Sequence, residues 1–211
     1  MKKFLLCAGV MLVAAHWPAA AQTVPDTRHA YAAGRFDLES GNYDKTIAEF
    51  NAALKRDPDN YEALSVRSAV YTGAKDPRAL ADLNAMVRLK PADGDVLIER
   101  GNVYFAMQDF DHALADYSAA LKLQPDSEIY ALNLALAQDA KGDSARALAT
   151  YSQLLRAKPD SANALTARGA LYAKQEKYDL ALADFNAALK LNPGAAATNN
   201  VAKVYIYQKK L

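Results

Sequence analysis

The feature that most constrains the fold is a proline that recurs at nearly constant spacing. Pro58, Pro91, Pro125, Pro159 and Pro193 follow one another at a period of about 34 residues, within the range that marks repeat architectures. Similar segments precede three of these prolines, as in Phe-Asn-Ala-Ala-Leu-Lys before the first and the last. We therefore expect a row of like units and not a single globular core.

Each unit reads as two helices. In the third unit Leu97, Gly101 and Tyr104 recur at helical spacing, and Ala113 and Tyr117 do so further along. The closing proline ends the second helix because it lacks the N–H that the helical ladder needs. No stretch alternates with period two, so we predict an all-α fold without a sheet.

Polar residues between the two helices are placed to cap the second one. Asn42, Asp109 and Asp143 take this place in three units, and Asp76-Pro77 takes it in the second. A short polar side chain there accepts hydrogen bonds from the free N–H groups of the helix start. Proline at the first helical position costs nothing, because its missing N–H has no partner there anyway.

These columns resemble the tetratricopeptide repeat (TPR), a helix pair with a period of about 34 residues. The small residue of its first helix appears as Gly34, Ser68, Gly101, Ala135 and Gly169. The alanine of its second helix appears as Ala79, Ala113, Ala147 and Ala181, with Thr46 in the first repeat. The large residue beside it is Phe50, Leu83, Tyr117, Tyr151 and Phe185.

The resemblance implies a right-handed superhelical solenoid of five TPR helix–turn–helix repeats plus a C-terminal capping helix. The expected boundaries are 27–60, 61–93, 94–127, 128–161 and 162–195 for the repeats and 196–211 for the cap. A terminal helix of this kind needs a polar outer face, and Asn199 and Lys203 are placed to supply one.

Two repeats depart from the pattern. The second is one residue short and lacks the aromatic residue that Tyr43, Phe110 and Tyr178 supply at the turn between helices. The fourth has Ser144 there, and Gln138 where other repeats have tyrosine. We expect both repeats to pack less tightly than their neighbours.

The segment from Met1 to Ala21 has the pattern of a cleavable signal peptide of bacterial type. Lys2 and Lys3 precede an uncharged apolar run, and Ala19-Ala20-Ala21 fits the small-residue cleavage rule. The run is too short for a stable membrane span. We expect cleavage after Ala21, a short linker at 22–26 and a periplasmic or secreted protein. Cys7, the only cysteine, lies in the removed segment, so the mature chain would carry no thiol.

Composition and motifs argue against catalysis and nucleic-acid binding. Removal of Lys2 and Lys3 leaves 23 basic and 24 acidic residues, a net charge of −1, which offers no basic face for phosphates. No phosphate loop, nucleophile elbow or His-Glu-x-x-His pair occurs. His112 and Asp116 share a helix face, but a lone exposed histidine makes a poor zinc site. We therefore expect no enzyme activity, no cofactor and no metal.

The resemblance places the partner site in a concave groove lined by the first helices. By family columns, the candidate residues are Arg28, Tyr31, Arg35, Ile98, Asn102, Phe105, Ile129, Leu132 and Leu136. The lysine, asparagine and arginine clamp of chaperone-tail binders is not present, since Asn102 alone matches it in kind. The middle of the expected groove is apolar instead.

The expected function is an exported scaffold or adaptor that binds a protein or peptide in this groove. The segment Ile129 to Ala137 is apolar nearly all round, which normally implies cover on every side. A ligand or a second copy of the chain would supply that cover, and so a homo-oligomer is compatible with it. The other reading is that leucine and alanine are simply good helix formers. Two further functions stay open: an accessory subunit of an envelope polysaccharide or secretion complex, and an envelope enzyme without a recognisable motif.

Overall fold

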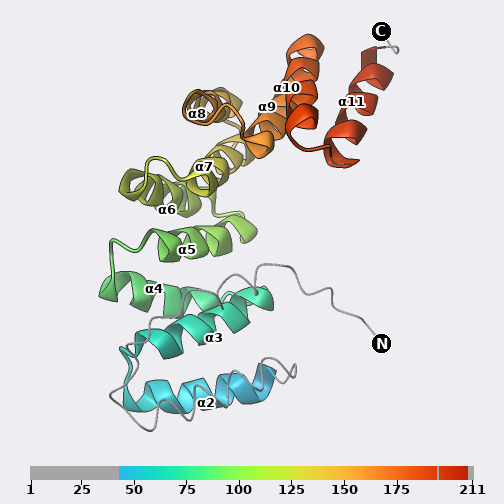
Figure 1. Ribbon diagram of the computed structural model, residues 1–211. Coiled ribbons are helices and arrows are strands. Elements are labelled where there is room, and N and C mark those ends of the chain that lie inside the picture. The colour runs from blue at the N-terminus through green and yellow to red at the C-terminus, as the bar shows by residue number, and fades with distance from the viewer. Residues whose placement is uncertain (1–42, 194, 209–211) are drawn as a thin grey trace, which may run out of the picture. The chain divides into compact units, whose positions relative to one another are not determined.

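The structure is a computed structural model that describes residues 43–193 and 195–208. The described residues form ten helices and no strand (Figure 1). This confirms the predicted all-α fold. The helices are α2 Tyr43–Arg56, α3 Tyr61–Gly73, α4 Ala79–Leu89, α5 Gly94–Ala106, α6 Phe110–Leu123, α7 Glu128–Ala140, α8 Ser144–Ala157, α9 Ala162–Lys174, α10 Tyr178–Leu191 and α11 Ala195–Gln208. The predicted signal peptide, the predicted linker, Asn42 and the predicted first helix of the first repeat lie outside the described residues.

The helices form two compact units, one with α2 to α5 and one with α6 to α11. Within each unit every helix packs on the next one along the chain (Figure 1). Such nearest-neighbour packing is what a repeat architecture requires, because each repeat buries its apolar face against the adjacent one. None of the described helices is long and apolar enough to cross a membrane.

The columns named in the sequence form the core of the described repeats. The small second-helix residues Thr46, Ala79, Ala113, Ala147 and Ala181 have no exposed surface at all. The large residues beside them are buried as well: Phe50, Leu83, Tyr117, Tyr151 and Phe185.

Gly169 shows why the first helix needs a small residue. A Cβ atom built there would lie 2.8 Å from Cε1 of Phe185 and 3.2 Å from the carbonyl oxygen of Ala181. The ring of the second helix therefore occupies the space that a side chain on the first helix would need, as the column pattern predicts.

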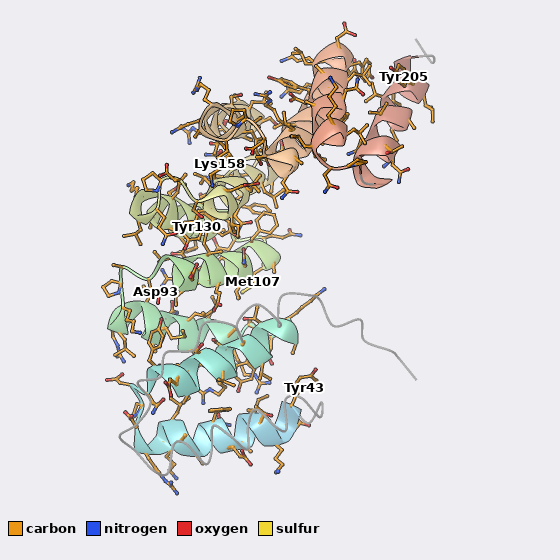
Figure 2. All side chains as sticks on the ribbon, in the orientation of Figure 1. Tyr43, Asp93, Met107, Tyr130, Lys158 and Tyr205 are labelled. Carbon is orange, nitrogen blue, oxygen red and sulfur yellow. The ribbon has the colours of Figure 1, made fainter. Side chains whose placement is uncertain are left out.

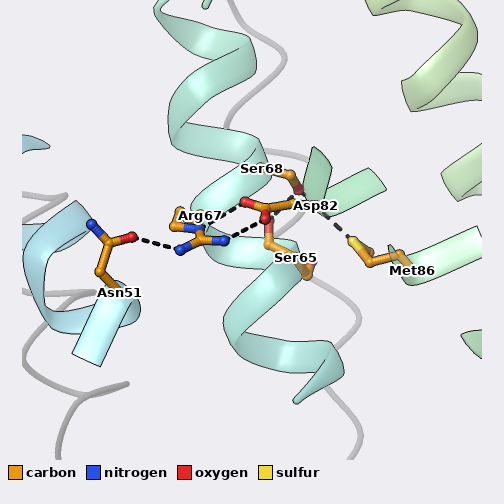
Figure 3. Close-up of polar contacts among 6 residues, drawn as sticks. All are labelled: Asn51, Ser65, Arg67, Ser68, Asp82 and Met86. Carbon is orange, nitrogen blue, oxygen red and sulfur yellow. Dashed lines mark hydrogen bonds and ion pairs between the residues drawn. The ribbon is translucent and has the colours of Figure 1, made fainter. Parts of the chain in front are cut away.

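An arginine that the columns did not single out ties three helices together (Figure 3). The Arg67 guanidinium donates from Nε and Nη2 to both carboxylate oxygens of Asp82, at 2.8 and 2.5 Å. Its Nη1 donates to Asn51 Oδ1 of the preceding repeat at 2.5 Å. Arg168 of the fifth repeat does the same with Asp184 and Ser152. We call this arrangement the arginine staple.

The starts of the first helices are capped by residues two positions after the closing prolines. Asn60, Asp93, Ser127 and Ser161 each accept a hydrogen bond from the backbone N–H three residues later. At the second helices, Asp143 accepts from the N–H of Arg146, and Asp76 accepts from the N–H of Arg78. The predicted capping role of Asp143 is thus confirmed. In the second repeat the prediction was wrong, because α4 begins at Ala79 with Arg78 as its N-cap, and Asp76 and Pro77 lie in the turn before it.

The two atypical repeats differ from one another. In the second repeat, Leu83 and Met86 are fully buried, and the Arg78 guanidinium lies 4.6 Å from the centre of the Tyr71 ring. This repeat thus buries its core residues although it lacks the aromatic residue at its turn. The fourth repeat has Leu134 and Thr150 in the places of the staple arginine and its aspartate. Its Thr150 instead donates to Gln138 Oε1 at 2.8 Å.

The last helix, α11, packs on the fifth repeat through Val204, which is buried against Phe185. Asn199 and Lys203 are exposed, in agreement with a polar outer face. Tyr205, Ile206 and Tyr207 are about half exposed as well, so this face is less polar than expected.

Candidate binding surface

Three aliphatic side chains form an open row on α7, which we call the α7 stripe. They are Ile129, Leu132 and Leu136, and their spacing of three and four residues puts them on one helix face. Ile129 is 62% exposed and Leu136 is 51% exposed, whereas Leu132 is half-buried. The opposite face of α7 is buried through Tyr130, Leu134 and Ala137. Ile129 and Leu136 are therefore not needed for the packing of the helix, whereas Leu132 also packs against the core.

A hollow of about 710 Å³ lies at the N-terminal end of the stripe. We call it the stripe pocket. Ile129 and Leu132 form its apolar wall, Lys158 contributes a polar side chain from the end of α8, and Asn163 contributes one from the next repeat. Lys158 is labelled in Figure 2, and it has no ion-pair partner among the residues that the structure describes. The Glu128 carboxylate, also in the wall, accepts a hydrogen bond from the Ser161 hydroxyl at 2.6 Å.

The other end of the stripe is closed by an ion pair. The next residue on the same face is Asp139, whose two carboxylate oxygens each lie 3.2 Å from the Lys174 ammonium of α9. Asp139 also accepts a hydrogen bond from Ser144 at 2.6 Å. The stripe is thus an apolar row between two polar ends, which is the general pattern of an apolar interface core with a polar rim.

The candidate residues of the third repeat are less accessible. Ile98 is only 7% exposed, so it offers a partner little surface, unlike what the family column implies. Asn102 is exposed and Phe105 is half-buried, both on α5. Arg28, Tyr31 and Arg35 lie outside the described residues, so their place in a groove stays a prediction.

A cluster of carboxylates lies beside these residues on α5. Tyr61 donates its hydroxyl to Asp93 Oδ2 at 2.7 Å, and the Lys90 ammonium lies 3.8 Å from the centre of the Tyr61 ring. Burial, followed by the charges of Asp95 and Asp93, raises the pKa of Glu99 to about 7. Burial and the hydrogen bond to Asp93 raise the pKa of Tyr61 as well. Negative charge is therefore crowded at this place in the first unit.

Sequence reasoning missed Lys158 as a site residue. Lysine directly before a closing proline looked like part of a helix end, and Lys90 has the same place. The two differ in their surroundings, since Lys90 covers a tyrosine ring and Lys158 lines a pocket.

Within residues 43–193 and 195–208 no group of three or more His, Cys, Asp or Glu side chains is placed to hold a metal ion.

Comparison with solved structures gives relatives of the same fold. MamA has a TM-score of 0.69 at 24% identity, over 76% of this chain and 94% of that chain. The TPR protein TTC0263 of Thermus thermophilus has a TM-score of 0.60 at 22% identity, over 85% and 98%. The first TPR of Spaghetti (RPAP3), bound to an HSP90 peptide, has a TM-score of 0.51 at 26% identity, over 55% and 93%.

A search of curated proteins gave no match to the sequence. The family model for the tetratricopeptide repeat, in contrast, matches at residues 31–94, 98–162, 132–196 and 166–209. These matches extend over most of the chain, and the structure has the helix pairs, the buried small-residue columns and the nearest-neighbour packing that the repeat needs. The chain belongs to the tetratricopeptide repeat family.

Proposed function

We propose that this protein is an exported scaffold that binds a protein or peptide segment on the α7 stripe. The observation that carries the proposal is the stripe itself, with two aliphatic side chains more than half exposed and a pocket of about 710 Å³ at its N-terminal end, lined by Ile129 and Leu132. Exposed apolar rows with a polar rim mark interaction sites more often than they mark plain surface. The peptide bound to the related Spaghetti (RPAP3) repeat supports the same kind of use.

The expected strength follows from the area that the stripe can bury. Full burial of one aliphatic side chain is worth about 1.5–3 kcal/mol. The partly exposed side chains of Ile129 and Leu136, together with what remains open of Leu132, supply a fraction of that each. Ordering of the bound segment offsets part of the gain. The stripe alone thus supplies only a few kcal/mol, and further contacts of the bound segment would have to supply the rest of a micromolar affinity, a binding free energy of about −8 kcal/mol.

The partner segment should carry apolar anchors and an acceptor group within reach of Lys158. The lysine ammonium is without an ion pair among the described residues, and the Asn163 side chain beside it is exposed. A charged acceptor there contributes mainly to the association rate and the orientation of the segment. Arg28 and Arg35 would extend this preference for acidic groups if they line the same groove.

Serine replacements on the stripe test the proposal. Ile129→Ser with Leu136→Ser should reduce partner recovery at least tenfold, about 1.4 kcal/mol, while the helical signal stays. These two positions are preferable to Leu132, which also packs against the buried core of the repeats. Leu180→Ser is the matched control, because Leu180 is 49% exposed and lies on α10 away from the stripe. Equal recovery from the double variant and the control would place the binding surface elsewhere.

Export is a separate part of the proposal. It rests on the pattern from Met1 to Ala21, with Lys2 and Lys3 before the apolar run and three alanines at its end. The mature chain should begin at Gln22. An intact mass that retains Met1, or a lipid on Cys7, would exclude this maturation.

A further inference from the structure

The fourth repeat contains a second hollow, on the side of α7 away from the stripe. Its volume is about 410 Å³, within the range of about 300–1,000 Å³ that ligand pockets have. We call it the turn pocket, because it lies at the turn between α7 and α8. Its walls include Leu114 and Ser118 of α6, Leu134 and Gln138 of α7, and Lys141 and Arg146 near the turn.

The other described repeats carry larger side chains at two of the positions that line this pocket. Tyr71, Tyr104 and Tyr172 stand at the position of Gln138, and Arg67, Arg100 and Arg168 stand at the position of Leu134. The fourth repeat therefore lacks both the aromatic ring and the staple arginine. Its glutamine turns to Thr150, which donates to the Gln138 side-chain oxygen at 2.8 Å.

The second repeat shows what such a ring does when it is present. Tyr71 is 6% exposed, and the Arg78 guanidinium lies 4.6 Å from the centre of its ring. Arg146 stands at the position of Arg78, directly before the buried alanine that begins the core column of each second helix. In the fourth repeat this arginine pairs with Asp143 at 3.1 Å and lines the pocket.

We propose that the turn pocket is a second binding site, which accepts an aromatic side chain of a partner protein against the guanidinium of Arg146. The ring would take the place that a tyrosine of the chain takes in the second repeat. Leu114 and Leu134 provide an apolar wall, and the Ser118 hydroxyl is within the same wall for a polar ring substituent. An aromatic ring is favoured over an aliphatic group because its face attracts the guanidinium.

This site is independent of the stripe. Leu134 and Gln138 are each two residues from Leu132 and Leu136, so about 200° of helix rotation separates the two rows. A partner segment on one face does not reach the other. Binding at the stripe and binding at the turn pocket can therefore be tested separately.

The test is a titration of the isotope-labelled full chain, followed by backbone amide NMR. The probes are N-acetyltyrosine methylamide, the matching leucine compound and free p-cresol. We expect the tyrosine probe to shift the amides of Lys141 to Arg146 with saturation in the millimolar range, and the leucine probe to bind at least fivefold more weakly. Arg146→Met should reduce the affinity for the tyrosine probe about threefold. Gln138→Tyr, which supplies the ring from within, should abolish the shifts.

Leu180→Ser serves as the control and should leave the titration unchanged, because it changes an exposed apolar residue on another helix. If Gln138→Tyr does not fold, Ser118→Phe closes the same pocket from α6 and takes its place. Three results would overturn the proposal. They are equal affinity for the leucine and tyrosine probes, unchanged amide shifts in Gln138→Tyr or its substitute Ser118→Phe, or binding of p-cresol without binding of the tyrosine probe. The last of these would make the pocket a site for small aromatic molecules.

Discussion

The arginine staple is the most consequential arrangement at the level of single residues. Asp82 is 2% exposed, and its two carboxylate oxygens are both bound by Arg67. The side-chain hydrogen bond to Asp82 raises the pKa of Arg67, so the arginine stays charged. Because the same guanidinium also binds Asn51, it holds two consecutive repeats in register.

Loss of one partner of this pair should be costly. Arg67→Met leaves a buried carboxylate without its counter-ion, and such a change typically costs about 3–5 kcal/mol. The matched control is Arg88→Met, which removes the exposed ion pair between Arg88 and Asp59 and should cost at most about 1 kcal/mol. Urea unfolding followed by circular dichroism measures both. Equal midpoints for the two variants would show that the staple does not stabilise the fold.

Glu99 gives the protein a predictable response to pH. Its pKa is about 7 in the folded chain, well above the usual 4.5, and burial is the main cause. Between these two values the folded state binds more protons than the unfolded state. The free energy of unfolding should therefore fall as the pH rises through this window.

Glu99→Gln removes the titrating group and should flatten this slope. The stability of the variant relative to the unaltered protein should increase from pH 5 to pH 8, as chemical denaturation at each pH would show. Asp160→Asn is the control, since Asp160 is an exposed carboxylate of the other unit. A constant difference between Glu99→Gln and the unaltered protein across this range would refute the account of Glu99.

Among the elements, the α7–α8 pair lacks side-chain contacts that the α9–α10 pair has. It lacks the staple, has Ser144 and Gln138 in place of aromatic rings, and contains the turn pocket. In the α9–α10 pair, Arg168 forms the arginine staple, and Tyr172 and Tyr178 supply the two aromatic rings. Local opening should therefore be easier in the fourth repeat than in the fifth.

Hydrogen exchange under native conditions measures this difference. Amides in Glu128–Ala157 should exchange faster than amides in Ala162–Leu191, because fewer side chains hold the first pair closed. The comparison has an internal control, since both pairs belong to the same unit. Slower exchange in α7 and α8 than in α9 and α10 would contradict it.

The core columns could be predicted from the sequence because they repeat at one period and depend on local geometry. Ala147, Tyr151 and Gly169 are buried where the pattern put them. The site residues were harder to predict, because their exposure depends on which side chains of neighbouring repeats pack against them. Ile98 is buried although its column is expected to be open, and Lys158, at the end of α8, lines a pocket that the sequence does not show.

The arginine staple was missed for a related reason. The Arg-Gly repeat at 100 and 168 was visible in the sequence, but the acceptors of the guanidinium lie about 16 residues away on two different helices. Periodicity within one helix does not show such pairs. The turn pocket likewise follows from two absent side chains, and a hollow appears only when the neighbouring helices are in place.

At the scale of the whole molecule, the repeat architecture makes function depend on exposed side chains. Each described helix packs mainly on its neighbours along the chain, and the near-neutral sequence has no strong field of one sign. Binding therefore depends on which side chains the helices leave open. In the described residues the α7 stripe is an aliphatic row flanked by polar ends, and this surface is the centre of the proposed function.

The most direct test places a photoreactive amino acid at Leu136 in the full chain, in cells, with the same probe at Leu180 as the reference. Both positions are about half exposed, so their chance of random contact is similar. We predict one discrete crosslinked product from position 136 and not from position 180, and its loss when Ile129→Ser is added. The same crosslinked products from both positions, or a product that survives Ile129→Ser unchanged, would contradict the assignment of the stripe as the binding surface.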